Sequence, residues 1–288
     1  MTNETISVTS YGRSFHVAGD LAFWEKMGNG TWEPETLQFL DRTITPDSVF
    51  IDIGAWIGPT SLFAASKGAK CHSFEPDPVA FAKFKNNIAT NGSEITQRIT
   101  ANNVAVTSHG ETVQLFTRFE FGDSGSSLLD RLKAEGSSVS VGSIKLMDYI
   151  RQNGLTRIDL VKMDIEGGEF QLLPELRQVL TQYKPVLFLA LHPHYLVESK
   201  EKSDHPNRIL RKLRRTLLTT LGMDAQKEQR RSAQEAIAQL LDTLKGHAYI
   251  YTPDLQPLSL KEAQQAMQGP LELVFSPRPL HSPSGGKA

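Results

Sequence analysis

Hydrophobic positions along the chain form short runs that predict buried strands, and patterns typical of helices separate them. Four runs of strand length cover residues 49–53, 70–75, 158–163 and 185–192. Each run leads into polar residues or glycines, and a helix is expected to begin at Pro59, between the first two runs. Buried strands that alternate with helices predict an α/β fold with a mostly parallel sheet.

The loop after the first of these strands has the composition of a nucleotide-type ligand site. It contains Asp52, Gly54 and Gly58, and glycine lets a backbone approach a ligand closely. A dinucleotide-binding loop needs the spacing G-x-G-x-x-G, and the middle glycine is missing here, which argues against NAD. An acid followed by two glycines at this spacing resembles motif I of class I S-adenosylmethionine (SAM) methyltransferases. The alternative is an ordinary buried strand and turn.

The second strand ends in an acid, at the position where such folds bind ribose. Glu75 follows the glycine loop by about twenty residues, and a carboxylate there can accept hydrogen bonds from both ribose hydroxyls. Asp77 is expected to cap the next helix and Pro78 to be its first residue. This helix is expected to bury Val79, Ala82, Phe84 and Ile88.

Polar residues near the first and third strands leave several interpretations open. Residues 1–20 are expected to form a hairpin, and Pro34 to begin a helix. Trp32 and Glu33, just before that helix, either pack against it and cap it or contact a ligand. Asn103, in a predicted third strand, either meets an adenine amino group or belongs to a turn.

The densest group of ionisable residues follows the third apolar run. Asp164, Glu166 and Glu169 lie close together at a strand end, where their charges repel one another unless a positive charge is near. Lys162 offsets one of them, and a metal ion or the sulfonium of SAM would offset more. His192 ends the neighbouring predicted strand, so it is expected beside these carboxylates as a base, a metal ligand or a loop histidine.

Two polar segments interrupt the pattern of strands and helices. The first, at residues 122–129, is either a loop over a site or an ordinary surface loop. The second, at residues 198–246, is helical and strongly charged, with leucines beneath a face rich in arginine and lysine. It is expected to be a solvated amphipathic helix, with a lid, a dimer contact or an anionic surface contact as alternatives.

These features divide the chain into one core with additions. We expect N-terminal cap elements at 1–45, a Rossmann-like core at 46–197, a charged helical insertion at 198–246, closing strands of the core sheet at 247–280 and a disordered tail at 281–288.

Composition argues against some classes of partner and indicates a cellular compartment. Of 288 residues, 39% are hydrophobic and 22% charged, and the formal charge of −1 gives no overall attraction to nucleic acid or anionic membranes. The polar N-terminus lacks the apolar core of a signal peptide, and no apolar run approaches the ~20 residues of a membrane span, so a cytoplasmic protein is expected. Cys71 is the only cysteine, which excludes an internal disulfide and a cysteine-rich zinc site.

Several segments together resemble the FkbM-type family of SAM-dependent O-methyltransferases. They are DIGAWIG at 52–58, FEPDPVAFAKFKNN at 74–87, NNVAV at 102–106, SGSSL at 124–128 and KMDIEGGEF at 162–170. The last is the most specific, because D-x-E-G-x-E after a strand is a hallmark of that family. The resemblance covers roughly residues 30–195 and implies a doubly wound, mostly parallel seven-stranded sheet of the class I SAM methyltransferase type.

The resemblance also implies roles for individual residues, with Glu33 near the amino group of the cofactor, Glu75 at its ribose and Asn103 on its adenine side. The implied cofactor-binding residues are Glu33, Asp52, Gly54, Ala55, Gly58, Glu75, Pro76, Asn103 and Asp164. The expected catalytic residues, which are also candidate ligands of Mg²⁺ or a similar cation, are Asp164, Glu166 and His192.

One position departs from the family pattern and leaves the general base open. Family members commonly carry an acid in the last core strand just before the His-Pro step. This chain has Ala190 and Leu191 there. If the acid acts in catalysis elsewhere in the family, His192 or Glu166 must replace it here.

The expected function is transfer of a methyl group from SAM to a hydroxyl of a sugar, a glycan or a small natural product. Such a hydroxyl needs a base or a divalent metal within reach to take its proton. One alternative is a nucleic-acid methyltransferase that holds phosphates with segment 198–246, but the sequence DIEG replaces the D/N-P-P-aromatic signature of base amino methyltransferases. Another is a non-catalytic SAM-binding or scaffold protein, and a homodimer is compatible with the sequence.

Overall fold

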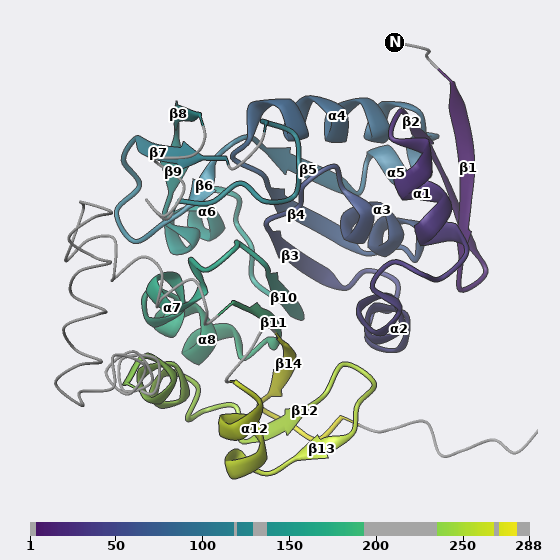
Figure 1. The fold of residues 1–288 in the computed structure, drawn as a ribbon. Helices are drawn as coiled ribbons and strands as arrows, with labels where there is room; N and C mark the ends of the chain where they lie inside the picture. The colour runs from purple at the N-terminus through teal and green to yellow at the C-terminus, as the bar shows by residue number, and fades with distance from the viewer. Residues whose placement is uncertain (1–3, 118–119, 129–136, 193–234, 268–270, 281–288) are drawn as a thin grey trace, which may run out of the picture.

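The computed structural model describes residues 4–117, 120–128, 137–192, 235–267 and 271–280. The strands of its main sheet are β3 (Val49–Ile53), β4 (Lys70–Phe74), β5 (Ile99–Asn102), β10 (Leu160–Met163), β11 (Val186–Leu191), β12 (Tyr249–Tyr251), β13 (Pro257–Leu258) and β14 (Leu271–Ser276). They lie in the order β13-β12-β14-β11-β10-β3-β4-β5 (Figure 1). The sheet places β10 at its centre, between β3 and β11.

Strand directions confirm the predicted fold class. Strands β11, β10, β3, β4 and β5 pair in parallel, while β14 runs antiparallel to both β11 and β12. The prediction of seven strands was one too few, because the two-residue strand β13 adds to the edge through an antiparallel pairing with β12. Sequence patterns rarely reveal so short a strand.

Helices cover both faces of this sheet (Figure 1). They are α1 (Leu21–Gly28), α2 (Pro34–Thr43), α3 (Pro59–Ser66), α4 (Pro78–Ala89), α5 (Ser93–Thr96), α6 (Leu146–Gln152), α7 (Glu169–Leu172), the 3₁₀ helix η2 (Leu173–Leu176), α8 (Arg177–Tyr183) and α12 (Leu260–Ala266). Alternate strand residues point to opposite faces. Ile51 and Val161 join an apolar cluster with α6 and α8, whereas Phe50 and Leu160 join one with α1, α2 and α3.

Within the described residues, three two-stranded sheets lie outside the main one. The predicted N-terminal hairpin consists of β1 (Thr5–Ser10) and β2 (Arg13–Ala18), which pair only with each other. The other two sheets pair β6 (Ala105–Val106) with β9 (Ser143–Ile144) and β7 (Val113–Phe116) with β8 (Ser138–Val141). The backbone N–H of Ala18 donates to the side chain of Asn87, which fastens the hairpin to α4.

Helix α4 begins as predicted but buries a different face. Asp77 caps it and Pro78 is its first residue. Its buried residues are Ala80, Phe84 and Asn87. The prediction that Val79 and Ala82 are buried was wrong, because the helix packs on the face defined by Ala80 and Phe84, and Val79 is 43% exposed.

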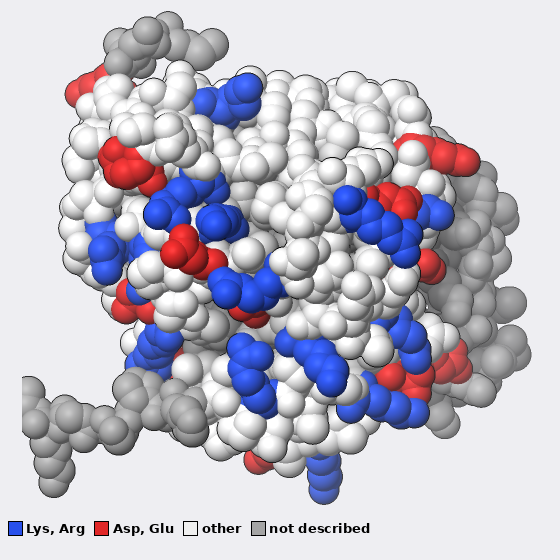
Figure 2. Space-filling view, turned by 180° about the vertical axis from the view of Figure 1, so that it is seen from behind, with Lys and Arg blue, Asp and Glu red and all other residues white. Residues whose placement is uncertain are grey.

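Most of the predicted charged insertion lies outside the described residues, as does the tail 281–288. Within the insertion, residues 235–243 are helical. On the face shown in Figure 2, Lys and Arg side chains lie among Asp and Glu side chains and white surface, without a continuous basic stripe. Across the described parts of the chain, no helix has the length and apolar character needed to cross a bilayer.

Candidate active site

A cavity of about 880 Å³ lies at the C-terminal ends of β3, β4, β10 and β11. Ligands of open α/β sheets bind at this edge. Side walls come from residues 22–35 before and within α2, from loop residues 123–128 and from the first residues of β14. A cavity of this volume can enclose most of a ligand of cofactor size.

The structure brings most of the predicted site residues to this cavity. Those that line it are Glu33, Gly54, Ala55, Glu75, Pro76, Asp164, Glu166 and His192. Asp52, Gly58 and Asn103 are not part of the lining, and their roles as direct cofactor ligands stay predictions.

Asp52 is fully buried and connects β3 to the start of α3. Its Oδ2 accepts hydrogen bonds of 2.6 Å from the hydroxyls of both Thr60 and Ser61. Burial raises the pKa of Asp52, and Lys162 and the two hydroxyls oppose this shift. The side chain therefore stabilises the fold of the loop directly beneath the cavity.

Gly58 and Asn103 also serve contacts within the protein. A Cβ on Gly58 would lie 2.2 Å from the ring of Phe84, so only glycine allows the loop to pack this closely on α4. The amide of Asn103 donates to the backbone carbonyl oxygens of Glu75 at 2.8 Å and Pro76 at 3.2 Å. Both residues thus fix the backbone around the cavity.

Gly54 brings the ends of two central strands together. Its φ is +86°, and a Cβ there would lie 1.9 Å from the carbonyl oxygen of Asp164. The missing side chain makes room for the backbone of Asp164. Gly54 also borders the cavity, so its predicted close approach to a ligand stays a prediction.

Glu75 follows β4 with its carboxylate held by the backbone. Oε2 accepts from the N–H of Trp56 at 2.7 Å and Oε1 from the N–H of Asp77 at 2.8 Å. Burial raises the pKa of Glu75 to about 7, although these two hydrogen bonds oppose the shift. Each oxygen keeps a second lone pair, so the group can still accept hydrogen bonds from ligand hydroxyls.

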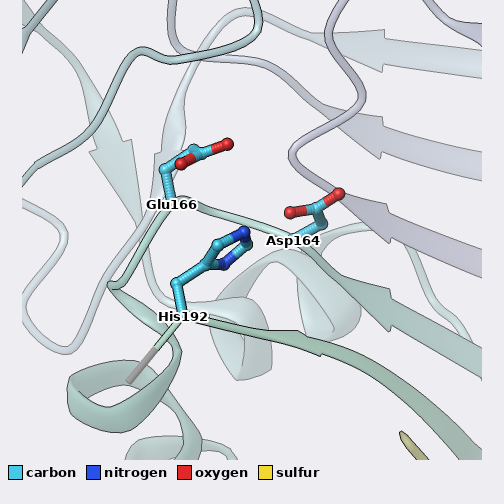
Figure 3. Close-up of side chains that lie close together, drawn as sticks. All are labelled: Asp164, Glu166 and His192. Atoms are coloured by element: carbon cyan, nitrogen blue, oxygen red, sulfur yellow. The ribbon is translucent and has the colours of Figure 1, made fainter. Parts of the chain in front are cut away.

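Asp164, Glu166 and His192 form a cluster at the end of the central strands. Figure 3 shows the first two on the loop after β10 and His192 at the end of β11, with their side chains around a common space. One ligand atom from each lies within 4.8 Å of the others, and all three residues are half-buried. The cluster confirms the predicted proximity of His192 to the carboxylates.

Glu169 orients the imidazole from behind. It is fully buried, and its Oε1 lies 3.2 Å from Nδ1 of His192. The same oxygen accepts from the backbone N–H groups of Ile165 and Gly167, each at 3.1 Å. The contact with Glu169 engages Nδ1, as in carboxylate–histidine pairs at metal and catalytic sites.

The charges around His192 make it a cation in this arrangement. Burial lowers its pKa, but the hydrogen bond to Glu169 and the charges of Glu169, Glu166 and Asp164 outweigh burial and raise the pKa to about 9. At neutral pH the imidazole is therefore protonated unless another cation shares these carboxylates.

Sequence reasoning missed Glu272 on β14, which lines the cavity beside Glu33. Its register partner on β11 is Ala190, and its Oε1 accepts from the buried Thr36 hydroxyl at 3.1 Å. Burial raises the pKa of Glu272. Burial also raises the pKa of Glu33, in this case to about 7. One signal was available in the sequence, because Glu272 is the only charged residue in the apolar run LELVFS.

Three aromatic rings form one wall of the cavity. Phe23 packs edge-on against Trp32 and Trp56, with ring centroids 5.1 and 4.6 Å apart, and all three residues line the cavity. Trp32 is thus a packed aromatic that also lines the cavity, and its contact with a ligand stays a prediction.

Three residues that line the cavity adopt strained backbone conformations. Glu33, Trp56 and Glu166 have φ of 38°, 50° and 54°, in the left-handed region that non-glycine residues rarely adopt. Such conformations persist where the surrounding structure imposes them, and they gather at functional sites.

The predicted polar loop of residues 122–129, which the structure describes up to Leu128, lines the cavity, and this favours a loop over the site. Asp77 Oδ2 accepts from the N–H of Gly122 at 2.7 Å and from the Ser126 hydroxyl at 2.9 Å. The indole N–H of Trp56 donates to the carbonyl oxygen of Gly122 at 3.0 Å. The loop is thus tied to α4 and to the glycine loop.

Comparison with known proteins agrees with this arrangement. The model of the methyltransferase FkbM domain matches residues 52–251. The 31-O-demethyl-FK506 methyltransferase FkbM of Streptomyces tacrolimicus is 26% identical over 176 residues, covering 50% of this chain and 68% of that protein.

Two solved structures are similar at lower identity. The methyltransferase FkbM from Methylobacillus flagellatus is 17% identical, with a TM-score of 0.40 over 90% of this chain and 56% of that one. A SAM-dependent methyltransferase from Agrobacterium tumefaciens is 15% identical, with a TM-score of 0.37 over 67% of this chain and 54% of that one. The chain thus spans little more than half the length of either structure. Because the family model covers most of the sequence, the chain belongs to the FkbM family of SAM-dependent methyltransferases.

Proposed function

We propose that this protein transfers the methyl group of SAM to a hydroxyl oxygen of a sugar, a glycan or a small natural product. The observation that carries the proposal is the cluster of Asp164, Glu166 and His192, in which two carboxylates that can accept a proton and one imidazole converge beside the cavity. An alcohol needs such a group, because it is a poor nucleophile until its proton is drawn away. The name of the Streptomyces relative, a 31-O-demethyl-FK506 methyltransferase, also supports transfer to oxygen.

The residues of the cavity fit SAM. Glu75 offers a carboxylate for the ribose hydroxyls, and acidic side chains such as Glu33 and Asp164 suit the positive sulfonium and ammonium groups. When bound, SAM supplies an electrophilic methyl group: the acceptor oxygen forms a bond to this carbon while the carbon–sulfur bond breaks and its electron pair stays on sulfur.

The residues of the chain would position the acceptor and remove its proton. A hydroxyl held between the carboxylates of Asp164 and Glu166 would lie within hydrogen-bond reach of both, and its proton would pass to one of these oxygens as the new bond forms. Glu169 would hold His192 in place during this step through its contact with Nδ1. Lys162 is unsuited to be the base, because its carboxylate neighbours outweigh burial and raise its pKa.

The same three side chains fit a divalent cation, which is the second version of the proposal. Two carboxylates and one imidazole form a donor set that Mg²⁺ or Mn²⁺ accepts. Asp164, Glu166 and His192 would hold the ion, and Glu169 would orient the imidazole from outside. A bound ion would lower the pKa of the acceptor hydroxyl.

The test is methyl transfer from SAM carrying a labelled methyl group to a panel of sugars, glycosides and macrolide-type alcohols. We expect formation of S-adenosylhomocysteine (SAH) and label on an oxygen. Asp164→Ala should lower the rate at least about a hundredfold, whereas the exposed Asp148→Ala, on α6, should leave it unchanged. Label on nitrogen or carbon, or full activity of Asp164→Ala, would overturn the proposal.

Dialysis against a chelator separates the two versions. If an ion is required, activity should be lost and should return when Mg²⁺ or Mn²⁺ is added. Full activity in the chelator leaves only direct proton transfer to the side chains.

A further inference from the structure

Lys162 is a buried cation at the centre of the sheet. It is 3% exposed and is the only buried lysine or arginine among the residues that the structure describes. Its Nζ lies 3.3 Å from Oδ2 of Asp164 and 3.9 Å from Oδ1 of Asp52. A buried ammonium is stable only with such partners.

The same carboxylates have few other positive neighbours. Oδ1 of Asp52 is buried and has no hydrogen-bond partner among the described residues, so Lys162 is its nearest compensation. Seven acidic residues of the described chain line the cavity, against two lysines and the imidazole of His192. The second lysine, Lys26, is exposed, and the charge of His192 depends on its protonation. Lys162 thus carries the fixed positive charge on the floor of an acidic cavity.

A ligand cation in this cavity has to share those carboxylates with Lys162. Asp164 borders the cavity and is also the closest ion-pair partner of Lys162. Two positive charges that face the same carboxylate repel each other, and in a poorly hydrated site the repulsion is only weakly screened. Lys162 is anchored in β10, so its charge stays when the cofactor loses its own.

We propose that Lys162, which is paired with Asp52 on its buried side, is a fixed counter-charge that shares the carboxylate of Asp164 with the sulfonium of SAM, and thereby limits the preference of the site for SAM over SAH. This inference rests on the proposed function. SAH keeps the amino and carboxylate groups of SAM, but its sulfur is a neutral thioether, so only SAM experiences the repulsion at sulfur. In the empty and product-bound states, Lys162 keeps the buried carboxylates partnered, which positions Asp164.

The test is calorimetric titration of the full-length protein with SAM and with SAH at pH 8, without an acceptor. In Lys162→Met, the ratio of the SAH dissociation constant to the SAM dissociation constant should rise at least about fivefold, because the repulsion on the sulfonium is removed. Lys162→Arg keeps the charge and should change the ratio less than about twofold. A ratio in Lys162→Met equal to that of the wild type overturns the inference.

Asp164→Asn provides an independent arm if Lys162→Met does not fold. Losing this negative charge leaves Lys162 facing the ligand with less compensation, so the ratio should fall at least about fivefold. An unchanged ratio in this variant also overturns the inference. If the wild type binds neither SAM nor SAH, the proposed function itself fails, whereas binding of both with unmoved ratios rejects only the role of Lys162.

Discussion

Glu75 shows how a single side chain both supports the fold and prepares a ligand site. Its two oxygens receive backbone N–H groups from Trp56 and Asp77, so the carboxylate holds the glycine loop next to the start of α4. Burial nevertheless raises its pKa from 4.5 to about 7. The free protein therefore pays in stability for a carboxylate that a ligand with hydroxyl groups can use.

The raised pKa predicts that the free protein is less stable at pH 8 than at pH 5. A carboxyl with a folded pKa above its unfolded value contributes full stability below pH 4.5, and this contribution is lost as the pH rises through about 7. The loss from Glu75 is up to roughly 3 kcal/mol. Urea unfolding of wild type and Glu75→Gln at several pH values should show a smaller pH slope in the variant.

Glu4→Gln is the control for this experiment. Because Glu4 is exposed, this variant should show the same slope of stability against pH as the wild type. The comparison uses slopes rather than absolute stabilities, since glutamine cannot accept both backbone N–H groups of Trp56 and Asp77. An equal slope in Glu75→Gln and wild type would contradict the assignment of the raised pKa.

At the scale of elements, the start of α4 and the loop over the cavity depend on one carboxylate. Oδ1 of Asp77 accepts from the N–H groups of Val79 and Ala80, and Oδ2 accepts from Gly122 and Ser126. Asp77 is fully buried. A helix cap and a loop that are far apart in sequence are therefore coupled.

Asp77→Ala should lower the free energy of unfolding by about 2 to 4 kcal/mol, from a lost cap and a buried N–H group left without a partner. It should also weaken SAH binding, because the loop residue Ser126 lines the cavity. Denaturant unfolding and calorimetry measure the two effects. Ser126→Ala removes only one hydroxyl and should cost about 1 kcal/mol or less. If Asp77→Ala binds SAH as tightly as the wild type does, the hydrogen bonds between Asp77 and the loop do not affect ligand binding.

Local signals explain which elements were predictable. The strands, the N-cap at Asp77 and the helix start at Pro78 follow from neighbouring residues, and the structure confirms them. The contact of Thr36 with Glu272 joins residues 236 positions apart, and only the packing of α2 beside β14 creates it. The prediction that Val79 is buried was wrong, because the face that α4 buries depends on the elements against which the helix packs.

For the molecule as a whole, the cavity at the edge of the parallel strands predicts stabilisation by the cofactor product. SAH at about a hundred times its dissociation constant should add about 2.7 kcal/mol to the free energy of unfolding. The melting temperature should therefore rise by several degrees. NAD at the same concentration should cause no rise, since the glycine loop lacks the dinucleotide spacing. A shift with NAD and none with SAH would contradict the cofactor assignment.

Glu33, Thr36 and Glu272 lie together at one wall of the cavity, and this has a consequence for protein engineering. The family domain matches residues 52–251, so these three side chains come from flanks on either side of it. The cavity is therefore modular, with its floor in the shared domain and one wall in sequence that lies outside it. A chimera that carries the flanks of a relative around this core is expected to keep its affinity for SAH while acquiring a different acceptor range.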